Sequence, residues 1–481
     1  MSSDGGPTVA VKMFVDKEKK RVLFAESDKE FVDVLFSFLT LPLGTIVRLL
    51  GKQSQIGCLD ELYRSVESLN QDHFQTMECK AMLLSPVNAA AFHLDRLKVK
   101  FDDTNQSGFY TCAPHRQFSS VPPGCKHGCS SSFWKCPPHL LAAVRDYGDG
   151  VFVKHGPKYI VTDDLHVAPA STRLVFSLLD RFGLQDQAKL EEKILELNAK
   201  KIIRLLKNVL ISKQPLTALC FDVCLSVPLT KYLDQLPENL FPKEASEDSK
   251  PVLSAVEITL VHTKDKASVL YAEVGGDFLD LLFGLLCVPL GSIIKTYGQW
   301  SQNGSIDGLY RNIDESARTW MKQECQTVLL APKLAPFFGC SSNVLQTEEM
   351  SPRSLAFTCF NCRAVKVAYG RTGCSCRYPT EVTVTESNPK FQGIGIVSTA
   401  YVKGGLRKFL VTSDLRVLDF TMTNTLQVMS AARIPKEKLV EKDLTLDKAQ
   451  SCSPCWQVLK LLRAAMLTRD ALTSLLLPHK K

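Results

Sequence analysis

Apolar and polar residues alternate at the start of the chain. Residues 8–16, TVAVKMFVD, place an apolar side chain at every second position, which is the pattern of a strand with one buried face. The charged residues 16–20, DKEKK, predict a turn, and residues 21–26, RVLFAE, predict a second strand. Residues 27–30, SDKE, match a helix capping box, so we expect a helix to follow.

Further helices and strands are expected downstream. LPLG at 41–44 should end the first helix and open a second, because proline breaks a helix interior but fits a first turn. A third helix is expected around 59–69, and the apolar residues 80–86, KAMLLSP, predict a strand. Residues 188–212 carry leucine and isoleucine at helical spacing and predict one long helix. Strand pairs followed by runs of helices predict an α+β fold.

The chain contains this pattern twice. Residues 22–63 and 269–310 are identical at 20 of 42 positions without a gap. The register persists with small slips, so that KYIVTDDLHV at 158–167 matches KFLVTSDLRV at 408–417. A period of this length is too long for a solenoid and predicts two homologous units.

We therefore predict two tandem homologous domains, residues 8–235 and 252–478, each a small β-sheet with packed helices. Residues 236–251, rich in proline, glutamate, serine and lysine, have no apolar periodicity and predict an exposed linker. Each domain should carry a zinc-ribbon-like cysteine insert, at about 109–137 in the first and about 356–378 in the second.

Composition limits the protein class. The 481 residues are 45% hydrophobic and 22% charged, as in folded globular proteins, and a net charge of +8 is mild for this length. No secretory signal pattern is present, so seventeen cysteines predict a reducing, cytoplasmic or nuclear location. The longest apolar run, 278–294, contains Asp280 and Pro289 and predicts a buried helix rather than a membrane span.

The second copy concentrates cysteines in FTCFNCRAVKVAYGRTGCSC at 357–376. Two cysteine pairs separated by a spacer are typical of a tetrahedral structural zinc site. Cys359 and Cys362 form a regular C-x-x-C pair, whereas Cys374 and Cys376 have only one residue between them. The second pair needs a kink, which Gly373 could allow, and the alternative is a degenerate loop without metal.

The first copy has a related cluster. Cys112 and His115 form one pair, and Cys125 and Cys129 form the other, which gives a Cys₃His ligand set. His127 or Cys136 could compete for the fourth position. A pair, a spacer and a second pair at the same place in both copies favours structural Zn²⁺ in each insert.

Catalytic chemistry is less well supported by the pattern. TDDLH at 162–166 suggests acid–base chemistry, but the second copy reads TSDLR, so a turn closed by an aspartate explains both. Asp33 and its counterpart Asp280 sit within apolar helices and need a partner. We interpret them as structural hydrogen-bond acceptors, and a catalytic carboxylate in a pocket remains the alternative.

Nucleic-acid binding is a further hypothesis. The second insert interleaves cations with aromatic side chains, an arrangement suited to single strands, and carries Arg363, Lys366, Arg371 and Arg377 beside Phe360, Tyr369 and Tyr378. The first insert has fewer cations. Retention on single-stranded nucleic acid that falls with salt would favour this hypothesis.

The repeated phrases, LPLGTIVRLL and KYIVTDDL above all, resemble the plant family named domain of unknown function 674, in two copies over nearly the whole chain. The resemblance implies an intracellular protein with cysteine pairs in the middle of each unit, and it brings no activity. We therefore expect a non-catalytic, zinc-binding interaction protein with a protein partner. A zinc-ribbon nucleic-acid-binding protein is the alternative, and an enzyme of unknown activity the third.

Overall fold

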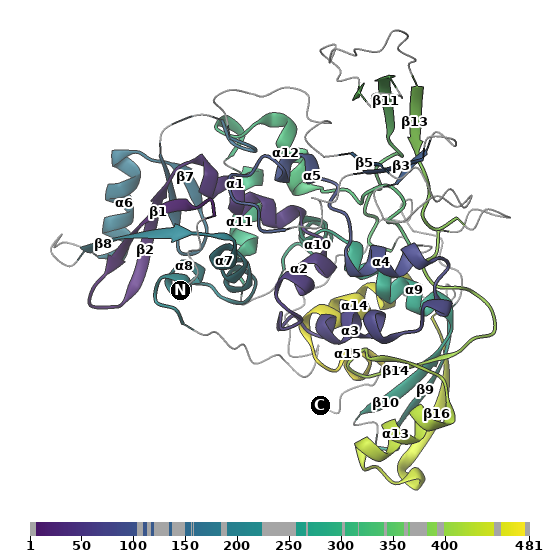
Figure 1. Cartoon of the computed structure of the whole chain (residues 1–481). Helices are drawn as coiled ribbons and strands as arrows, with labels where there is room; N and C mark the ends of the chain where they lie inside the picture. Colours follow the sequence, from purple (N-terminus) through teal and green to yellow (C-terminus); the bar gives the residue numbers. More distant parts are fainter. Residues whose placement is uncertain are drawn as a thin grey trace.

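The computed structural model describes residues 6–102, 109–112, 117–119, 134–136, 150–223, 256–446 and 454–476, with internal gaps at 155, 157, 184–189, 266–267, 301–303, 316, 341–343, 360–363, 366–381 and 392–398. The fold is α+β, as predicted, and contains two five-stranded antiparallel sheets and one six-stranded sheet (Figure 1). The predicted linker lies outside these residues.

The first sheet has the strand order β7-β6-β2-β1-β8. Its members are β1 (Val9–Asp16), β2 (Arg21–Ser27), β6 (Tyr159–Thr162), β7 (Val167–Pro169) and β8 (Leu190–Leu197). The alternation read from the sequence is real: Val9, Val11, Met13 and Val15 of β1 are all buried. The predicted hairpin of β1 and β2 therefore forms the centre of the sheet.

The second sheet has the corresponding order, β15-β14-β10-β9-β16. Its members are β9 (Val256–Thr263), β10 (Val269–Val274), β14 (Phe409–Thr412), β15 (Val417–Asp419) and β16 (Leu439–Leu446). The matching phrases of the two copies thus occupy matching strands, since KYIVTDDL contains β6 and KFLVTSDL contains β14.

The helices also follow one order in the two halves of the chain, which we define as the residues before and after 236–251. The first half contains α1 (Lys29–Ser37), α2 (Leu43–Leu49), α3 (Leu59–Ser68), α4 (Met77–Leu84), α5 (Ala91–Leu94), α6 (Thr172–Phe182), α7 (Ala199–Ile211) and α8 (Pro215–Cys220). The second half contains α9 (Gly276–Gly284), α10 (Leu290–Tyr297), α11 (Ile306–Glu315), α12 (Gln323–Leu330), α13 (Met422–Ala432), α14 (Pro454–Leu467) and α15 (Ala471–Leu476). Short 3-10 turns link them at η1 (Phe38–Thr40), η2 (Gln71–His73), η9 (Leu285–Cys287), η10 (Ala317–Thr319) and η11 (Lys436–Lys438).

Two predicted elements were wrong. Residues 80–86 form no strand: they belong mostly to α4, which the Thr76 side chain caps by accepting a hydrogen bond from Cys79 N at 3.2 Å. The predicted long helix 188–212 divides into β8 and α7. Asn198 ends the strand and caps the helix by accepting from Lys201 N at 3.0 Å. The apolar residues of LEEKILEL have helical spacing and do not alternate, but pairing with β1 makes this segment a strand.

The halves interlock. Helix α3 of the first half packs beside α14 and α15, next to the second sheet, while α11 and α12 of the second half lie with α1 near the first sheet (Figure 1). Ser65 of α3 accepts a hydrogen bond from Val417 N of β15 at 2.8 Å. Asn312 of α11 lies 3.2 Å from His166 Nδ1, beside β7. One buried hydrophobic cluster contains residues of both halves.

The third sheet combines strands of the two predicted inserts with β13, which follows the second insert, in the order β12-β11-β13-β4-β3-β5. These are β3 (Phe109–Cys112), β4 (Gln117–Ser119), β5 (Trp134–Cys136), β11 (Ser354–Cys359), β12 (Ala364–Val365) and β13 (Val382–Glu386). A parallel pairing of β13 with β4 joins the halves, with Thr385 opposite Gln117. The inserts therefore contribute strands to one shared sheet.

Candidate functional site: a cleft between the two halves

Most of the predicted zinc ligands lie outside the described residues: His115, Cys125, Cys129, Cys362, Cys374 and Cys376. The same holds for the cations and aromatic side chains of the nucleic-acid hypothesis. Backbone positions are described for Cys112, at the end of β3, and Cys359, at the end of β11. Within the described part of the chain, no three His, Cys, Asp or Glu side chains are grouped as a metal would require.

The strand register separates Cys112 from Cys359. Cys112 pairs with Gln117, Gln117 with Thr385, and Thr385 with Ser354. Three inter-strand steps amount to about 14 Å, and the five residues from Ser354 to Cys359 add roughly 16 Å along β11. These two cysteines therefore belong to different ends of the sheet and cannot bind one metal ion.

Asp33 and Asp280 both bind backbone amides. Asp33 is 2% exposed and accepts hydrogen bonds from Val151 N, Phe152 N and Val153 N at 2.6, 2.8 and 3.2 Å. Burial raises the pKa of Asp33 to about 6, although these three N–H groups act in the opposite direction. Asp280 accepts from Tyr401 N at 2.5 Å. Each carboxylate fixes a distant segment of its own half to the apolar helix that carries it.

The aspartates of TDDLH also have structural contacts. Thr162 donates to Asp164, and the corresponding Thr412 donates to Asp414 at 2.5 Å. Asp163 accepts from Leu216 N at 2.8 Å and from Thr217 N at 3.0 Å, which anchors α8. Burial raises the pKa of Asp163 to about 6. The turn interpretation therefore accounts for Asp164 and Asp414, whereas Asp163 anchors α8.

Four of the described cysteines are buried free thiols: Cys58, Cys79, Cys287 and Cys325. Burial raises the pKa of the Cys58 and Cys79 thiols, that of Cys325 to about 11 and that of Cys287 to about 12. Because the thiolate is the nucleophile, raised pKa values make these thiols unreactive. They act as packing residues, and Cys79 and Cys325 occupy matching positions in α4 and α12.

A cleft of about 780 Å³ opens where α3 of the first half faces the second sheet. From the first half it is lined by residues of the loop before α3 and by Asp60, Glu61 and Arg64. The second half contributes the β14–β15 turn, α13 and the residues that precede α15. Apolar groups such as Leu270 and Val428 contribute to the same lining, so the cleft combines an apolar surface with charge.

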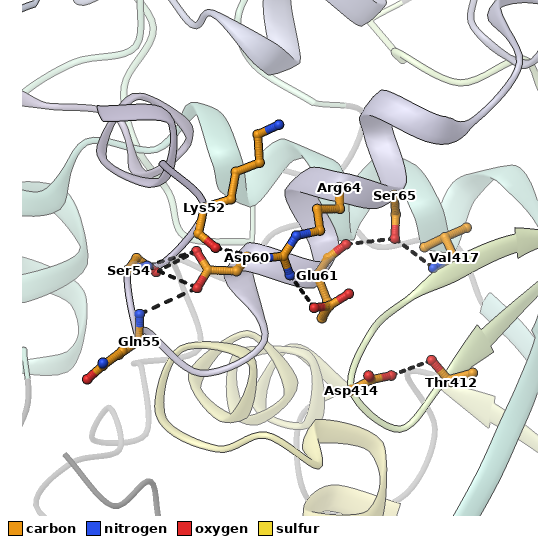
Figure 2. Close-up of polar contacts among 10 residues, drawn as sticks. All are labelled: Lys52, Ser54, Gln55, Asp60, Glu61, Arg64, Ser65, Thr412, Asp414 and Val417. Carbon is orange, nitrogen blue, oxygen red and sulfur yellow. Dashed lines mark hydrogen bonds and ion pairs between the residues drawn. The ribbon is translucent and has the colours of Figure 1, made fainter. Parts of the chain in front are cut away.

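Asp60 shapes the first wall of the cleft (Figure 2). Its carboxylate accepts hydrogen bonds from Ser54 N at 3.0 Å, from Ser54 Oγ at 2.8 Å and from Gln55 N at 3.4 Å. The loop that it holds turns through left-handed conformations, with positive φ at Gly51, Lys52, Gln55 and Gly57. The Asp60 side chain of α3 therefore holds the Ser54–Gln55 part of this loop.

Charged groups face each other across the cleft. Arg64 donates to Glu61 and, at 2.7 Å, to Lys52 O, while Asp414 and Thr412 lie on the opposite wall (Figure 2). Arg469 and Asp470 complete the charged lining. Charged side chains that are paired but partly exposed, around an apolar surface, are suited to binding a polar ligand or peptide. Each can give up its contact within the protein and form one with the ligand.

The corresponding place in the other half is closely packed. Trp300 stands where the first half has Gln53; it is 2% exposed and donates from its indole to Leu210 O at 3.3 Å. Gly308 stands where the first half has Glu61, and a Cβ atom there would lie 2.6 Å from Asp164 O. Gln53 and Glu61 therefore mark the open side of the molecule.

This cleft has no direct signature in the sequence, because its walls come from different halves. The differences Gln53/Trp300 and Glu61/Gly308 within an otherwise matching segment were visible in the repeat alignment. These two differences indicate a position at which the two copies have different roles.

The fold and the cleft define a class: an α+β protein of two interlocked halves with a cleft at their junction. The chain belongs to the family described as Protein of unknown function (DUF674), whose sequence model matches residues 5–449 and, in a second match, 352–481. No curated protein and no solved structure matches the chain. Among the helices that the structure describes, none is both long enough and apolar enough to cross a membrane.

Proposed function

We propose that this protein is a non-catalytic interaction protein that binds a protein partner in the cleft between α3 and the second sheet. In this proposal the two halves arose by duplication, and structural Zn²⁺ stabilises the insert of each. The location is cytoplasmic or nuclear, in keeping with the seventeen cysteines of the chain.

The observation that carries the proposal is the cleft itself, with its mixed apolar and charged lining from both halves. A site of about 780 Å³ is large enough for several side chains of a bound peptide. The buried aspartates support a role other than catalysis, because Asp33, Asp163 and Asp280 accept hydrogen bonds from backbone amides.

The zinc part of the proposal rests on the two cysteine segments. Their strands β3 and β11 end at Cys112 and Cys359, at different ends of one sheet, which suits two separate metal sites. A metal closed by two ligand pairs would stabilise segments too short to have a core of their own. The proposed ligands remain Cys112, His115, Cys125 and Cys129, with Cys359, Cys362, Cys374 and Cys376 for the second site.

Glu61→Arg tests the cleft, because it reverses one charge of the lining without touching a core residue. The full-length protein and this variant would be immobilised and exposed to a plant-tissue extract, and the bound proteins compared by mass spectrometry. Asp314→Arg, on the exposed face of the corresponding helix α11, is the matched control. We expect a partner that binds wild type and Asp314→Arg but loses at least tenfold in binding to Glu61→Arg.

A partner set that is identical for all three proteins would contradict binding in the cleft. Retention of wild type and both variants on single-stranded DNA or RNA, decreasing with salt, would instead support nucleic-acid binding.

A further inference from the structure

The contact between the halves is reciprocal around the two LPLG segments. Leu43 N donates to Val288 O at 3.0 Å, and Leu290 N donates to Leu41 O at 2.9 Å. Pro42 and Pro289 form an antiparallel bridge between these bonds. Each half thus presents the same segment to the other, which is the arrangement of an isologous two-fold interface.

The same reciprocity recurs where the third helix of each half meets the last long helix of the other. Cys58 N, before α3, donates to Ala465 O of α14 at 2.7 Å. Ser305 N, before α11, donates to Val209 O of α7 at 2.8 Å. The first half has Cys58 where the second has Ser305. This difference does not affect the hydrogen bond, because backbone atoms make it.

A third pair of contacts lies further along the interface. Phe74 of the first half bridges to Val402, and Met321 of the second half bridges to Val153. Flanking backbone bonds repeat the match, with Lys403 N donating to His73 O at 2.8 Å and Lys154 N donating to Trp320 O at 2.9 Å. Three sets of contacts therefore obey one two-fold relation.

We infer that this surface is an assembly interface for two units of this fold. The two halves of the chain associate through this surface even when residues 236–251 no longer connect them. The partner that binds this surface of either half is therefore a second unit of the same fold. Separating the two halves would expose apolar residues of their shared core. Obligate protein–protein interfaces are apolar in the same way.

The test uses the full-length protein with a specific protease site placed within 236–251. After cleavage, size-exclusion chromatography at about micromolar concentration should give one species of the intact mass that contains both fragments. Fragments that elute apart, or that aggregate once the linker is cut, would overturn the inference.

Two glycine variants sharpen this test. Gly57 and Gly51 lie in the same loop and both have positive φ, so valine strains the backbone at either position. A Cβ atom at Gly57 would overlap the Ala465 carbonyl group and lie 2.6 Å from the Met466 carbonyl carbon, both in the other half. At Gly51, by contrast, a Cβ atom would have no described atom within 4 Å apart from those of Gly51 and its two chain neighbours.

The cleaved Gly57→Val protein should therefore dissociate at a concentration at least tenfold higher than the cleaved Gly51→Val protein does. Equal behaviour of the two variants would show that this contact does not hold the halves together. If Gly57→Val fails to fold, Gly304→Val replaces it, because a Cβ atom there would lie 2.7 Å from Leu210 O of the opposite half.

Discussion

Asp33 shows how one carboxylate organises a half of this molecule. It lies in the apolar helix α1 and receives three amide N–H groups from residues about 120 positions later in the chain. The sequence indicated that Asp33 needed a partner, but it could not identify Val151, Phe152 and Val153, because backbone donors have no sequence signature. Burial then leaves the carboxylate easier to protonate than usual.

Asp33 should make stability depend on pH. Its pKa of about 6 in the folded protein lies above the value of an unfolded chain, so the stabilisation is complete below about pH 4 and is lost as pH rises through 6. Urea unfolding from pH 4 to pH 7 should show wild type losing roughly 2 kcal/mol relative to Asp33→Asn.

The control for this comparison is Asp277→Asn, an exposed carboxylate of α9 in the other half. It should follow the wild-type pH dependence. A constant difference between wild type and Asp33→Asn over the whole range would contradict the raised pKa.

At the scale of elements, periodicity predicted the central hairpins well, since β1 alternates cleanly between buried and more exposed positions. It failed for KAMLLSP, a short apolar run compatible with either helix or strand, and for LEEKILEL, whose apolar residues have helical spacing. Capping decides the first of these, because Thr76 supplies the N-cap of α4. Sheet pairing decides the second, because β8 pairs along its whole length with β1.

The cap of α4 provides a direct measurement. Thr76→Ala removes the acceptor for Cys79 N and the donor to Pro389 O, so the free energy of unfolding should fall by about 1 kcal/mol. Thr76→Ser keeps the hydroxyl and should lose much less. Equal losses for the two variants in chemical denaturation would show that the hydroxyl does not cap this helix.

At the scale of the whole molecule, the repeat predicted two equivalent units but not their interlocking. Sequence identity shows that α3 and α11 correspond, yet it does not show that each packs beside the sheet of the other half. The cleft could not be predicted for the same reason. Glu61 and Asp414 line one cleft only because α3 packs beside the sheet of the other half. The proposed metal sites rest on cysteine spacing alone.

Interlocking predicts cooperative unfolding. Because one buried cluster contains both halves, circular dichroism and tryptophan fluorescence should report a single coincident transition in urea. The indole of Trp300 bonds to Leu210 O across the junction, so fluorescence is sensitive to the contact itself. Two resolved transitions would mean that the halves unfold as separate domains.

The central claim, an interaction protein stabilised by zinc in each half, is tested most directly by metal content. Mass spectrometry of the intact protein and of Cys112→Ser and Cys359→Ser should find two zinc ions per chain in wild type and one in each variant. Wild-type protein without zinc would contradict the claim and reduce both cysteine segments to loops without metal.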